Sequence, residues 1–302
     1  MIAALFVAVA ALVATTPAHA QRATGDLLVV DVLDVGQGDA ILIRAPNGKS
    51  VLVDAGPTRD AAAKWLREKR VESVDMAVVT HHHLDHLGGM DSVIREWRPR
   101  YFLATDSAHT TQSWLRLLQT VKAEGITSVL PTARPRLVEL GDVKLTILPQ
   151  PPHDPDDEND NSIGLRLQYG GFSMLLTGDS EPPSRQWWLE NCPQLLRDCS
   201  VLKLAHHGSR NGTDSDWLDV VRPELAVVSL GADNNYGHPH SETLELLKAH
   251  EIPLVRTDQW GTITMVSDGE TWNLVSSSLT RRDPKPRRGA VAVGESSRAR
   301  RR

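Results

Sequence analysis

The sequence predicts an α/β fold, in which short buried strands alternate with amphipathic helices. Two observations lead to this class. Runs of β-branched and apolar residues recur between turn signals and helical patterns, and side chains of the kinds that bind metal ions follow several of these runs. In such folds the chemistry lies in loops at the carboxyl ends of strands. No Pro/Gly/Ser-rich linker divides the middle of the chain, so we expect a single domain.

Three strand patterns open the predicted fold, within residues 26–56. The turn signals "GQGD" and "PNGK" separate them, and the Asn-Gly pair of the second suits a tight hairpin. An amphipathic pattern over residues 58–74 predicts a helix, and the apolar run "MAVVT" at residues 76–80 predicts a buried strand. This strand leads directly into the segment "HHHLDH", residues 81–86.

The second half of the chain repeats the alternation of strands and helices. A hairpin is expected over residues 162–179, and helices around Trp187 and Trp188 and over residues 215–223 and 241–250. Further strands are expected within residues 143–150, 200–209, 225–231, 253–258 and 262–268. Side chains that can bind metals follow the strands of both halves at Asp54, His81–His86, Asp179, His206, His207, His238 and His240.

The segment "HHHLDH" is the strongest single signal, because it holds four of the 12 histidines. Imidazoles that charge together repel one another, and a bound metal ion removes this cost by holding them neutral. If the segment turns from a strand into a helix, His81 and His83 can face one ion while Asp85 and His86 face a second. Imidazole and carboxylate ligands suit zinc, with manganese or iron as lesser alternatives.

Residues 1–20 differ from the rest of the chain in being uncharged and largely apolar. They end in Ala-His-Ala at residues 18–20, which is typical of the cleavage site of a secretory signal peptide. We therefore expect an exported protein, with a folded domain over residues 21–280. A cytosolic protein with an apolar start is the alternative, since the usual basic opening is missing. No segment reaches the ~20 apolar residues that a bilayer requires, so no transmembrane domain is expected.

The C-terminal residues 281–302 contain nine basic and two acidic residues without periodicity, which predicts a disordered tail. The tail is either a solvating end or a contact for an anionic surface such as nucleic acid, a cell-wall polymer or lipid headgroups. The formal net charge of the whole chain is −5 in spite of this basic tail, so the rest of the chain is strongly acidic, which argues against a broad basic groove for duplex nucleic acid. In an exported protein, Cys192 and Cys199 are expected to form a disulfide, whereas in a cytosolic protein they would be buried thiols.

The motif "HHHLDH" matches the HxHxDH signature of the metallo-β-lactamase superfamily. The further motifs "DVGQGDAILIRAPNGKSVLVDAGP", "NDNSIGLRLQYGGFSMLLTGD", "LKLAHHGS" and "YGHPHSETLELL" resemble the hydrolase-like domain of ComEC-type competence proteins, over most of residues 27–275. The resemblance implies an αββα sandwich with a site for two divalent metal ions, zinc or alternatively manganese, along one edge. It also implies that His81, His83, Asp85 and His86 are metal ligands.

The resemblance assigns roles to residues further along the chain. Asp179 matches the aspartate that bridges both metal ions, where a carboxylate offsets the repulsion between two dications. His206 best matches the final ligand of the second ion, and His207 is the alternative, because sequence alone does not show which imidazole faces inward. Asp54 resembles the aspartate that orients a ligating histidine by accepting its other ring N–H. A turn aspartate before Gly56 is the alternative for Asp54.

Many members of the superfamily supply a third histidine to the first metal ion, just before the hairpin that ends in the bridging aspartate. Here Asn159 and Asn161 stand near that place, as they do in the ComEC-like branch, and His153 lies upstream in an acidic loop. The first ion is therefore expected to bind more weakly, with water or an amide oxygen completing its coordination. His153 could reach in from the loop, although a solvated turn is the simpler interpretation.

Two metal ions that activate water imply hydrolysis. Ser209, His238 and His240 offer hydrogen-bond donors for phosphate oxygens or a leaving alkoxide, which favours a phosphodiester substrate in nucleic acid or a cell-wall polymer. The candidate catalytic residues are Asp85, His207 and His238. Two alternatives remain: a hydrolase of the same fold that acts on a lactone, thioester or β-lactam, and a non-catalytic binding module. For His238 and His240 a purely structural role in the loop is also open.

Overall fold

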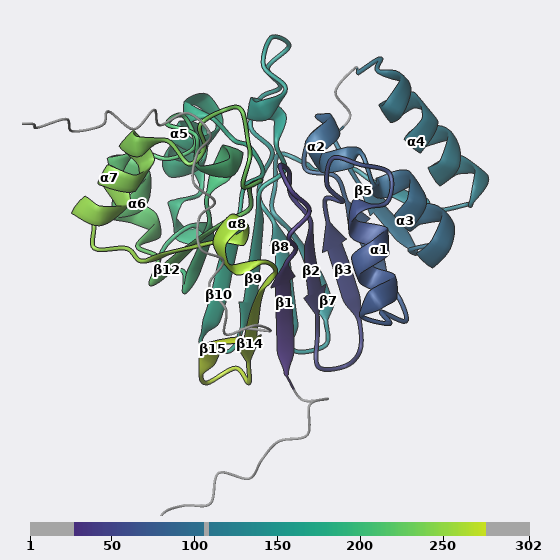
Figure 1. Ribbon diagram of the computed structural model, residues 1–302, viewed down its shortest axis with the longest axis horizontal. Helices are drawn as coiled ribbons and strands as arrows, with labels where there is room; N and C mark the ends of the chain where they lie inside the picture. The colour runs from purple at the N-terminus through teal and green to yellow at the C-terminus, as the bar shows by residue number, and fades with distance from the viewer. Residues whose placement is uncertain (1–26, 106–108, 276–302) are drawn as a thin grey trace, which may run out of the picture.

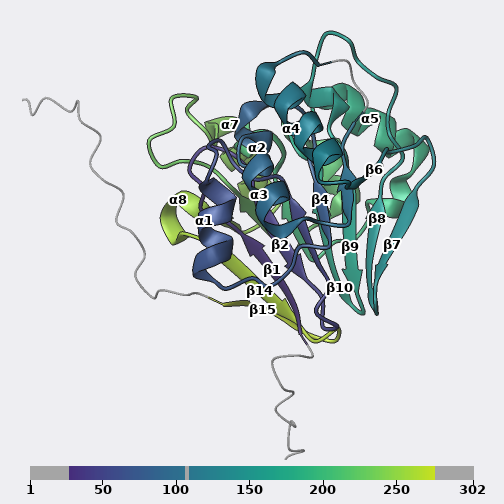
Figure 2. The same cartoon turned by 90° about the vertical axis from the view of Figure 1, so that its right-hand side faces the viewer.

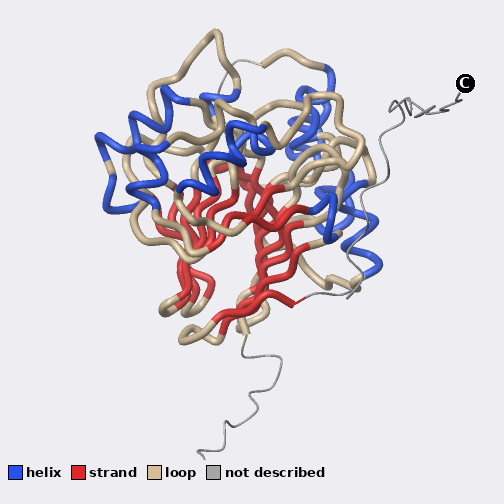
Figure 3. The backbone as a smooth tube through the Cα atoms, turned by 60° about the vertical axis from the view of Figure 1, so that its left-hand side comes forward, coloured by secondary structure: helices blue, strands red, loops and turns tan. Residues whose placement is uncertain are grey.

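The structure is a computed structural model that describes residues 27–105 and 109–275. The predicted signal peptide over residues 1–20 and the basic tail over residues 281–302 lie outside the described residues, as do both ends of the predicted domain. Two β-sheets pack face to face at the centre, and helices cover their outer faces (Figure 3). This arrangement confirms the expected αββα sandwich.

The first sheet contains the N-terminal strands together with the last two strands of the described residues. Within the described residues it has eight strands, in the spatial order β15 (Trp272–Val275), β14 (Ile263–Ser267), β1 (Leu28–Val32), β2 (Ile41–Arg44), β3 (Ser50–Val53), β4 (Met76–Val78), β5 (Tyr101–Leu103) and β6 (Thr127–Val129). The pairs from β15 to β3 are antiparallel, whereas β3, β4, β5 and β6 run parallel to one another.

The second sheet is built from the middle of the chain. In the described part it has seven strands, in the order β13 (Leu254–Arg256), β12 (Leu225–Val228), β11 (Val201–Lys203), β10 (Phe172–Leu176), β9 (Leu165–Tyr169), β8 (Val143–Ile147) and β7 (Arg136–Leu140). The pairs from β7 to β10 are antiparallel and those from β10 to β13 are parallel. Each sheet therefore ends in a parallel group of four strands.

Two sets of helices enclose the sandwich. The first set covers the first sheet (Figure 2) and comprises α1 (Ala61–Glu68), α2 (Leu84–Leu87), α3 (Met90–Trp97) and α4 (Gln112–Ala123). The second set lies on the opposite side of the molecule (Figure 1) and comprises α5 (Pro182–Asn191), α6 (Ser215–Val221) and α7 (Ser241–Ala249). The short helix α8 (Thr257–Trp260) connects β13 to β14. No helix in the described ranges is long and apolar enough to cross a membrane.

Alternation of side chains along the strands explains why the sheets are covered on both faces. In β3, Val51 and Val53 face the second sheet, whereas Leu52 packs against the first set of helices. Successive side chains of a strand point to opposite faces, so a run that is apolar at every position belongs to a sheet buried on both sides. On α1, Ala62, Ala63 and Leu66 supply the matching apolar surface. These runs are the patterns that predicted the strands from the sequence.

The two cysteines lie in the apolar layer between the second sheet and its helices. Cys192 follows α5, Cys199 precedes β11, and both are free and buried. Burial raises the pKa of the Cys192 thiol to about 11 and that of the Cys199 thiol to about 12. The structure therefore does not contain the predicted disulfide: both thiols are free, and both side chains are packed in the apolar cluster that also contains Trp188 and Leu196.

Candidate metal centre

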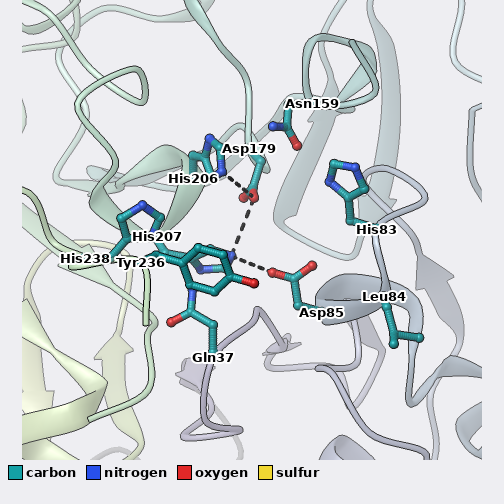
Figure 4. Close-up of a pocket in the computed structure, with 10 residues that line it drawn as sticks. All are labelled: Gln37, His83, Leu84, Asp85, Asn159, Asp179, His206, His207, Tyr236 and His238. Atoms are coloured by element: carbon teal, nitrogen blue, oxygen red, sulfur yellow. Dashed lines mark hydrogen bonds and ion pairs between the residues drawn. The ribbon is translucent and has the colours of Figure 1, made fainter. Parts of the chain in front are cut away.

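Four ligand-type side chains converge where parallel strands of the two sheets end. Their ligand atoms all lie within 4.8 Å of one another, and they belong to Asp85, His86, Asp179 and His207. Asp85 and His86 lie on α2 after β4, Asp179 follows β10, and His207 follows β11. Figure 4 shows Asp85, Asp179 and His207 facing one another in the centre of a pocket. Carboxyl ends of parallel strands thus bring distant segments to one place.

The segment between β4 and α2 positions the histidine motif. His83 precedes the first residue of α2, and its carbonyl oxygen accepts hydrogen bonds from the backbone N–H groups of His86 and Leu87. This turn directs the ring of His86 back beside that of His81, with 4.2 Å between ring centroids. Nε2 of His81 lies 3.1 Å from Nδ1 of His83. His81 and His83 therefore form a pair next to the four-residue group.

Asp179 reaches the centre through a close approach of three segments. Gly178 has a φ of +54°, and a Cβ atom there would lie 2.8 Å from Oγ of Ser162 and 3.0 Å from Cβ of Thr80. Only glycine fits such a position without displacing its neighbours. The backbone N–H of Asp179 donates to Oγ of Ser162 at 3.1 Å. The tight turn places the buried carboxylate of Asp179 opposite the histidine motif.

The structure separates the two adjacent histidines His206 and His207. Both have left-handed backbone conformations, with φ values of 50° and 52°, which turn the chain sharply after β11. His207 is buried, and its Nε2 lies 3.2 Å from Oδ2 of Asp85 and 3.5 Å from Oδ2 of Asp179. His206 has a side chain 25% exposed, 4.0 Å from Asp179, with its Nδ1 3.2 Å from Glu181. The geometry favours His207 over His206 as a ligand.

The buried carboxylate of Asp54 contacts the ring nitrogen of His86 that does not face Asp179. Nδ1 of His86 lies 2.8 Å from Oδ2 of Asp54, whose Oδ1 accepts the backbone N–H of Thr80 at 2.8 Å. Oγ of Thr80 also donates to Oδ2 of Asp54 at 2.7 Å. If Nδ1 of His86 donates to Asp54, its Nε2 carries the lone pair toward Asp179. This is the contact that the predicted orienting role of Asp54 requires.

A comparable arrangement supports His207, and the sequence did not reveal it. Nδ1 of His207 lies 2.9 Å from the carbonyl oxygen of Ser229 and 3.5 Å from Oδ1 of Asp39. Nζ of Lys203 donates to the other oxygen of Asp39 at 2.6 Å. Asp39 belongs to "GQGD" and Lys203 to "LKLAHHGS", so both lie in motifs that the resemblance included. Their mutual pairing is a tertiary contact that neither motif shows by itself.

The charges around the centre favour a cation there. Burial disfavours the charged form of His207, but the carboxylates of Asp179, Asp39 and Asp85 outweigh it and raise the pKa of His207 to about 10. Burial likewise opposes protonation of His86, and Asp179 and Asp54 raise its pKa well above the ordinary value. Burial alone would raise the pKa of Asp179, but His86 and His207 outweigh it and lower that pKa well below its usual range.

The hydrogen-bonding pattern tests whether a metal ion fits the residues. Among the described residues, neither Nε2 of His86 nor Oδ1 of Asp179 has a hydrogen-bond partner, although both atoms are buried and 3.2 Å apart. A buried polar atom without a partner is costly. If Nδ1 of His86 donates to Asp54 and Nδ1 of His207 donates to the carbonyl oxygen of Ser229, the Nε2 atom of each ring carries a lone pair. These lone pairs then face the carboxylates of Asp85 and Asp179. A divalent cation satisfies all of these atoms at once, so the residues fit a metal ion.

A pocket of about 330 Å³ lies over this centre. Its walls come from both halves of the chain (Figure 4), and the lining residues are Gln37, His83, Leu84, Asp85, Asn159, Asp179, His206, His207, Tyr236 and His238. The sequence did not indicate Gln37 or Tyr236. The ring of His238 is stacked beside that of Tyr236, with 5.6 Å between centroids. Burial, together with His207 and His206, lowers the pKa of His238 to about 4, so its ring is neutral at neutral pH.

Other predicted residues lie outside this pocket. The side chain of Asn161 bonds within its own loop: its Oδ1 is 2.7 Å from Nδ1 of His153, and its Nδ2 donates to the carbonyl oxygen of Asp154. His153 accordingly does not reach the centre. Nδ1 of His240 accepts the backbone N–H of Arg210, and its Nε2 contacts the carbonyl oxygen of Tyr236 at 3.2 Å. For His240 the structural interpretation therefore fits better.

Of Ser209 and Asn159, only Asn159 lines the described pocket. Oγ of Ser209 accepts the backbone N–H of Asn211, and Ser209 is absent from the residues that line the described pocket. Asn159 does line the pocket, and its buried Oδ1 has no hydrogen-bond partner among the described residues. Asn159 and Asn161 stand near the position where many superfamily members have a third histidine ligand. Of these two, Asn159 is the one whose amide oxygen is available to the centre.

Two facing sheets, outer helices and a histidine and aspartate centre at the strand ends define a metal-dependent hydrolase fold. In agreement, the family model "Metallo-beta-lactamase superfamily" matches residues 33–232, and the chain belongs to this superfamily. The chain is similar to ComE operon protein 3 of Bacillus subtilis, with 30% identity over 253 residues that cover 78% of this chain and 32% of that protein. These findings confirm the resemblance to ComEC-type competence proteins.

Two further similarities extend this comparison. Competence protein ComA of Neisseria gonorrhoeae is 29% identical over 249 residues, covering 78% of this chain and 31% of that protein. The chain thus spans about a third of the length of these two curated relatives. The crystal structure of the metallo-beta-lactamase fold protein YhfI from Bacillus subtilis covers 76% of this chain and 96% of that one, with a TM-score of 0.51 and 13% identity. At this identity the likeness concerns the fold alone.

Proposed function

We propose that the protein is a metal-dependent phosphodiesterase, and that its substrate is a nucleic acid or another phosphodiester polymer. His81 and His83 would bind the first divalent ion, Asp85, His86 and His207 would bind the second, and Asp179 would contact both. His207 takes the place that the sequence resemblance gave to His206. Zinc suits this set of imidazoles and carboxylates, and manganese is the alternative. Asn159 would offer its amide oxygen near the first ion.

Two divalent ions bound at this centre would activate a water molecule and polarise the bond that it attacks. The residues of the chain supply the rest. Asp54 and the carbonyl oxygen of Ser229 fix the rings of His86 and His207, so that these ligands need not reorganise during the reaction. The carboxylate of Asp179 offsets the repulsion between two cations.

His238 would act on the substrate from the wall of the pocket. Because its ring is neutral near pH 7, it can donate a hydrogen bond to a phosphate oxygen without adding a further charge beside the metal ions. A bound phosphodiester is anionic, and its charge would raise the pKa of His238 toward the range of a proton donor. The leaving alkoxide could then receive its proton from this ring.

The observation that carries the proposal is the polar wall above the metal-type centre. His206, His238 and Asn159 line the pocket, and Leu84 and Tyr236 are the aliphatic and aromatic hydrophobic residues among the described residues that line it. An acyl substrate such as a lactone or thioester would favour a more apolar pocket. A phosphodiester instead needs hydrogen-bond donors around its charged oxygens, which these side chains provide.

A substrate panel tests this proposal. Purified protein loaded with zinc or manganese is assayed on bis-p-nitrophenyl phosphate, plasmid DNA, single-stranded DNA, nitrocefin and a simple lactone. We expect hydrolysis of phosphodiesters alone. Ring opening of nitrocefin or the lactone, with phosphodiesters left intact at the same metal loading, would replace the proposal by the acyl-hydrolase alternative. Inactivity on every substrate despite full metal loading would favour the binding module.

Export is a separate proposal, supported by the apolar residues 1–20 and their Ala-His-Ala ending. An exported enzyme would meet extracellular nucleic acid or cell-wall polymers, which agrees with a phosphodiester substrate. Mass spectrometry of the protein from its native host tests it: cleavage after Ala20 leaves Gln21 as the first residue, whereas an intact Met1 contradicts export by this signal.

A further inference from the structure

A second group of metal-type side chains lies beside the proposed centre, in residues that the proposed function does not use. The ligand atoms of His82, His109 and Glu158 all lie within 4.8 Å of one another. His82 is the second of the four histidines of "HHHLDH", but it does not line the pocket. The three residues come from three connections: β4 to α2, β5 to α4, and β8 to β9. This group is called the outer cluster below.

The ring of His82 is held in one orientation by its surroundings. It packs against the indole of Trp114 on α4, with 3.9 Å between ring centroids. Its Nε2 lies 3.3 Å from Oγ of Thr105, and its Nδ1 lies 2.9 Å from Oε1 of Glu158. One ring nitrogen thus contacts a hydroxyl oxygen while the other faces the carboxylate. Metal-binding histidines commonly show this pattern, because an acceptor at one nitrogen fixes the tautomer that presents the other.

The remaining imidazole completes the arrangement. The ring of His109 lies 5.2 Å from that of His82, centroid to centroid. An ion pair between His82 and Glu158 accounts for two of the three residues, but it gives no reason for a second imidazole at this distance. Two imidazoles and one carboxylate, contributed by separate segments, are a donor set that zinc takes in proteins. His109 and Glu158 are partly exposed, so water can reach the cluster.

We propose that the outer cluster binds a third divalent transition-metal ion, of which zinc is the best match, through His82, His109 and Glu158. Thr105 is a positioning residue that orients His82. The site is separate from the proposed pair of ions, because none of these three residues belongs to the ligands proposed for that pair. It requires no particular reaction, so it stands whether or not the protein proves to be a phosphodiesterase.

Such an ion would stabilise the wall of the pocket. Oε1 of Glu158 also accepts the backbone N–H of His82 at 3.0 Å, so the carboxylate already joins two connections at this point. His83 and Asn159, the next residues of those connections, both line the pocket. An ion that also held His109 would tie a third connection to them. The outer cluster would therefore limit the motion of one proposed ligand and of the asparagine beside the first ion.

Metal stoichiometry tests the proposal without an activity assay. Chelator-treated protein is dialysed against micromolar free zinc, and bound zinc is measured by elemental analysis. His109→Ala and Glu158→Gln should each bind one equivalent less than wild type, and Thr105→Val should weaken that equivalent ~10- to 100-fold. His153→Ala removes a histidine from the loop that also carries Glu158 and should leave the zinc content unchanged.

A variant background separates the outer cluster from the proposed pair of ions. In the double variant Asp179→Ala/His207→Ala, one equivalent of zinc should remain, and adding His109→Ala should remove it. Circular dichroism confirms that each protein is folded. Equal zinc content in folded wild type, His109→Ala and Glu158→Gln would overturn the proposal. A folded Asp179→Ala/His207→Ala variant that binds no zinc would also overturn the outer cluster. That result would not contradict the proposal that two ions bind at the centre.

Discussion

Nζ of Lys203 donates a 2.6 Å hydrogen bond to Oδ2 of Asp39, and both side chains are almost fully buried. Lys203 ends β11 in the second sheet, whereas Asp39 precedes β2 in the first, so the pair joins the two sheets directly. Oδ1 of Asp39 lies 3.5 Å from Nδ1 of His207. Burial raises the pKa of Asp39, but Lys203 and His207 outweigh it and lower that pKa to about 2. One ion pair thus links the sandwich to a proposed metal ligand.

Replacing Lys203 tests this link. Lys203→Met leaves the carboxylate of Asp39 buried without its main partner, which typically costs about 3–5 kcal/mol in the free energy of unfolding. Urea unfolding measures the change. Lys64→Met, which removes an exposed lysine on α1, serves as control and should alter stability by less than ~0.5 kcal/mol. Equal stability of both variants would show that the pair contributes nothing to the fold.

His207 and His206 should differ in their effect on metal binding. His207→Ala should lose one equivalent of metal relative to wild type, because its Nε2 faces both Asp85 and Asp179. His206→Ala should keep the metal content of wild type, since this ring contacts Glu181 and lies 4.0 Å from Asp179. Elemental analysis of both reloaded variants decides between them. Loss of metal in His206→Ala alone would restore the assignment that the sequence resemblance favoured.

His238 is expected to act on the substrate and not on the metal ions. In His238→Ala the metal content should persist, while the rate of phosphodiester hydrolysis falls ~10²-fold or more, as for a lost proton donor or oxyanion contact. Parallel measurement of kcat and of bound metal checks this. His240→Ala is a matched control, because this histidine only joins loops in the structure. A variant that hydrolyses phosphodiesters at the rate of wild type would show that His238 is structural.

The two thiols should be unreactive in the folded protein. Their pKa values of about 11 and 12 lie above the ordinary value of 9.0. Between pH 9 and 11 the unfolded thiols ionise while the folded ones do not, so stability is full below pH 9 and falls as the pH rises above it. A thiol reagent at pH 8 should label neither cysteine in the native protein and both in urea. No labelling in urea without reductant would instead indicate the disulfide that the sequence predicted.

Local patterns predicted many of the strands and helices, but no element was predicted over residues 87–142, which contain α3, β5, α4, β6 and β7. The buried runs of β4 and β12 are apolar at every position, which is a signal that the sequence carries by itself. By contrast, β6 and β7 are mostly exposed, and the sequence offered no strand pattern there. Hydrogen bonds to the adjacent β5 and β8 define these edge strands. Their structure is therefore a property of the sheet.

The site shows the same division. "HHHLDH" and Asp179 could be identified because strand and ligand-type residues are contiguous in the sequence. The choice between His206 and His207 depends on two successive left-handed residues, a backbone feature that two adjacent histidines do not reveal. The contact between Asp39 and Lys203 joins residues that are 164 positions apart. Such long-range contacts arise from the packing of the two sheets, and neither sequence spacing nor periodicity indicates them.

The most direct test of the proposed function is a metal titration of chelator-treated protein, with hydrolysis of bis-p-nitrophenyl phosphate as the readout. Wild type should be inactive without metal and should gain activity to saturation as zinc or manganese is added. Asp179→Ala should remain inactive at every metal concentration, because no carboxylate then offsets the repulsion between the two ions. Full activity in the absence of metal, or an Asp179→Ala variant as active as wild type, would contradict a mechanism that depends on this centre.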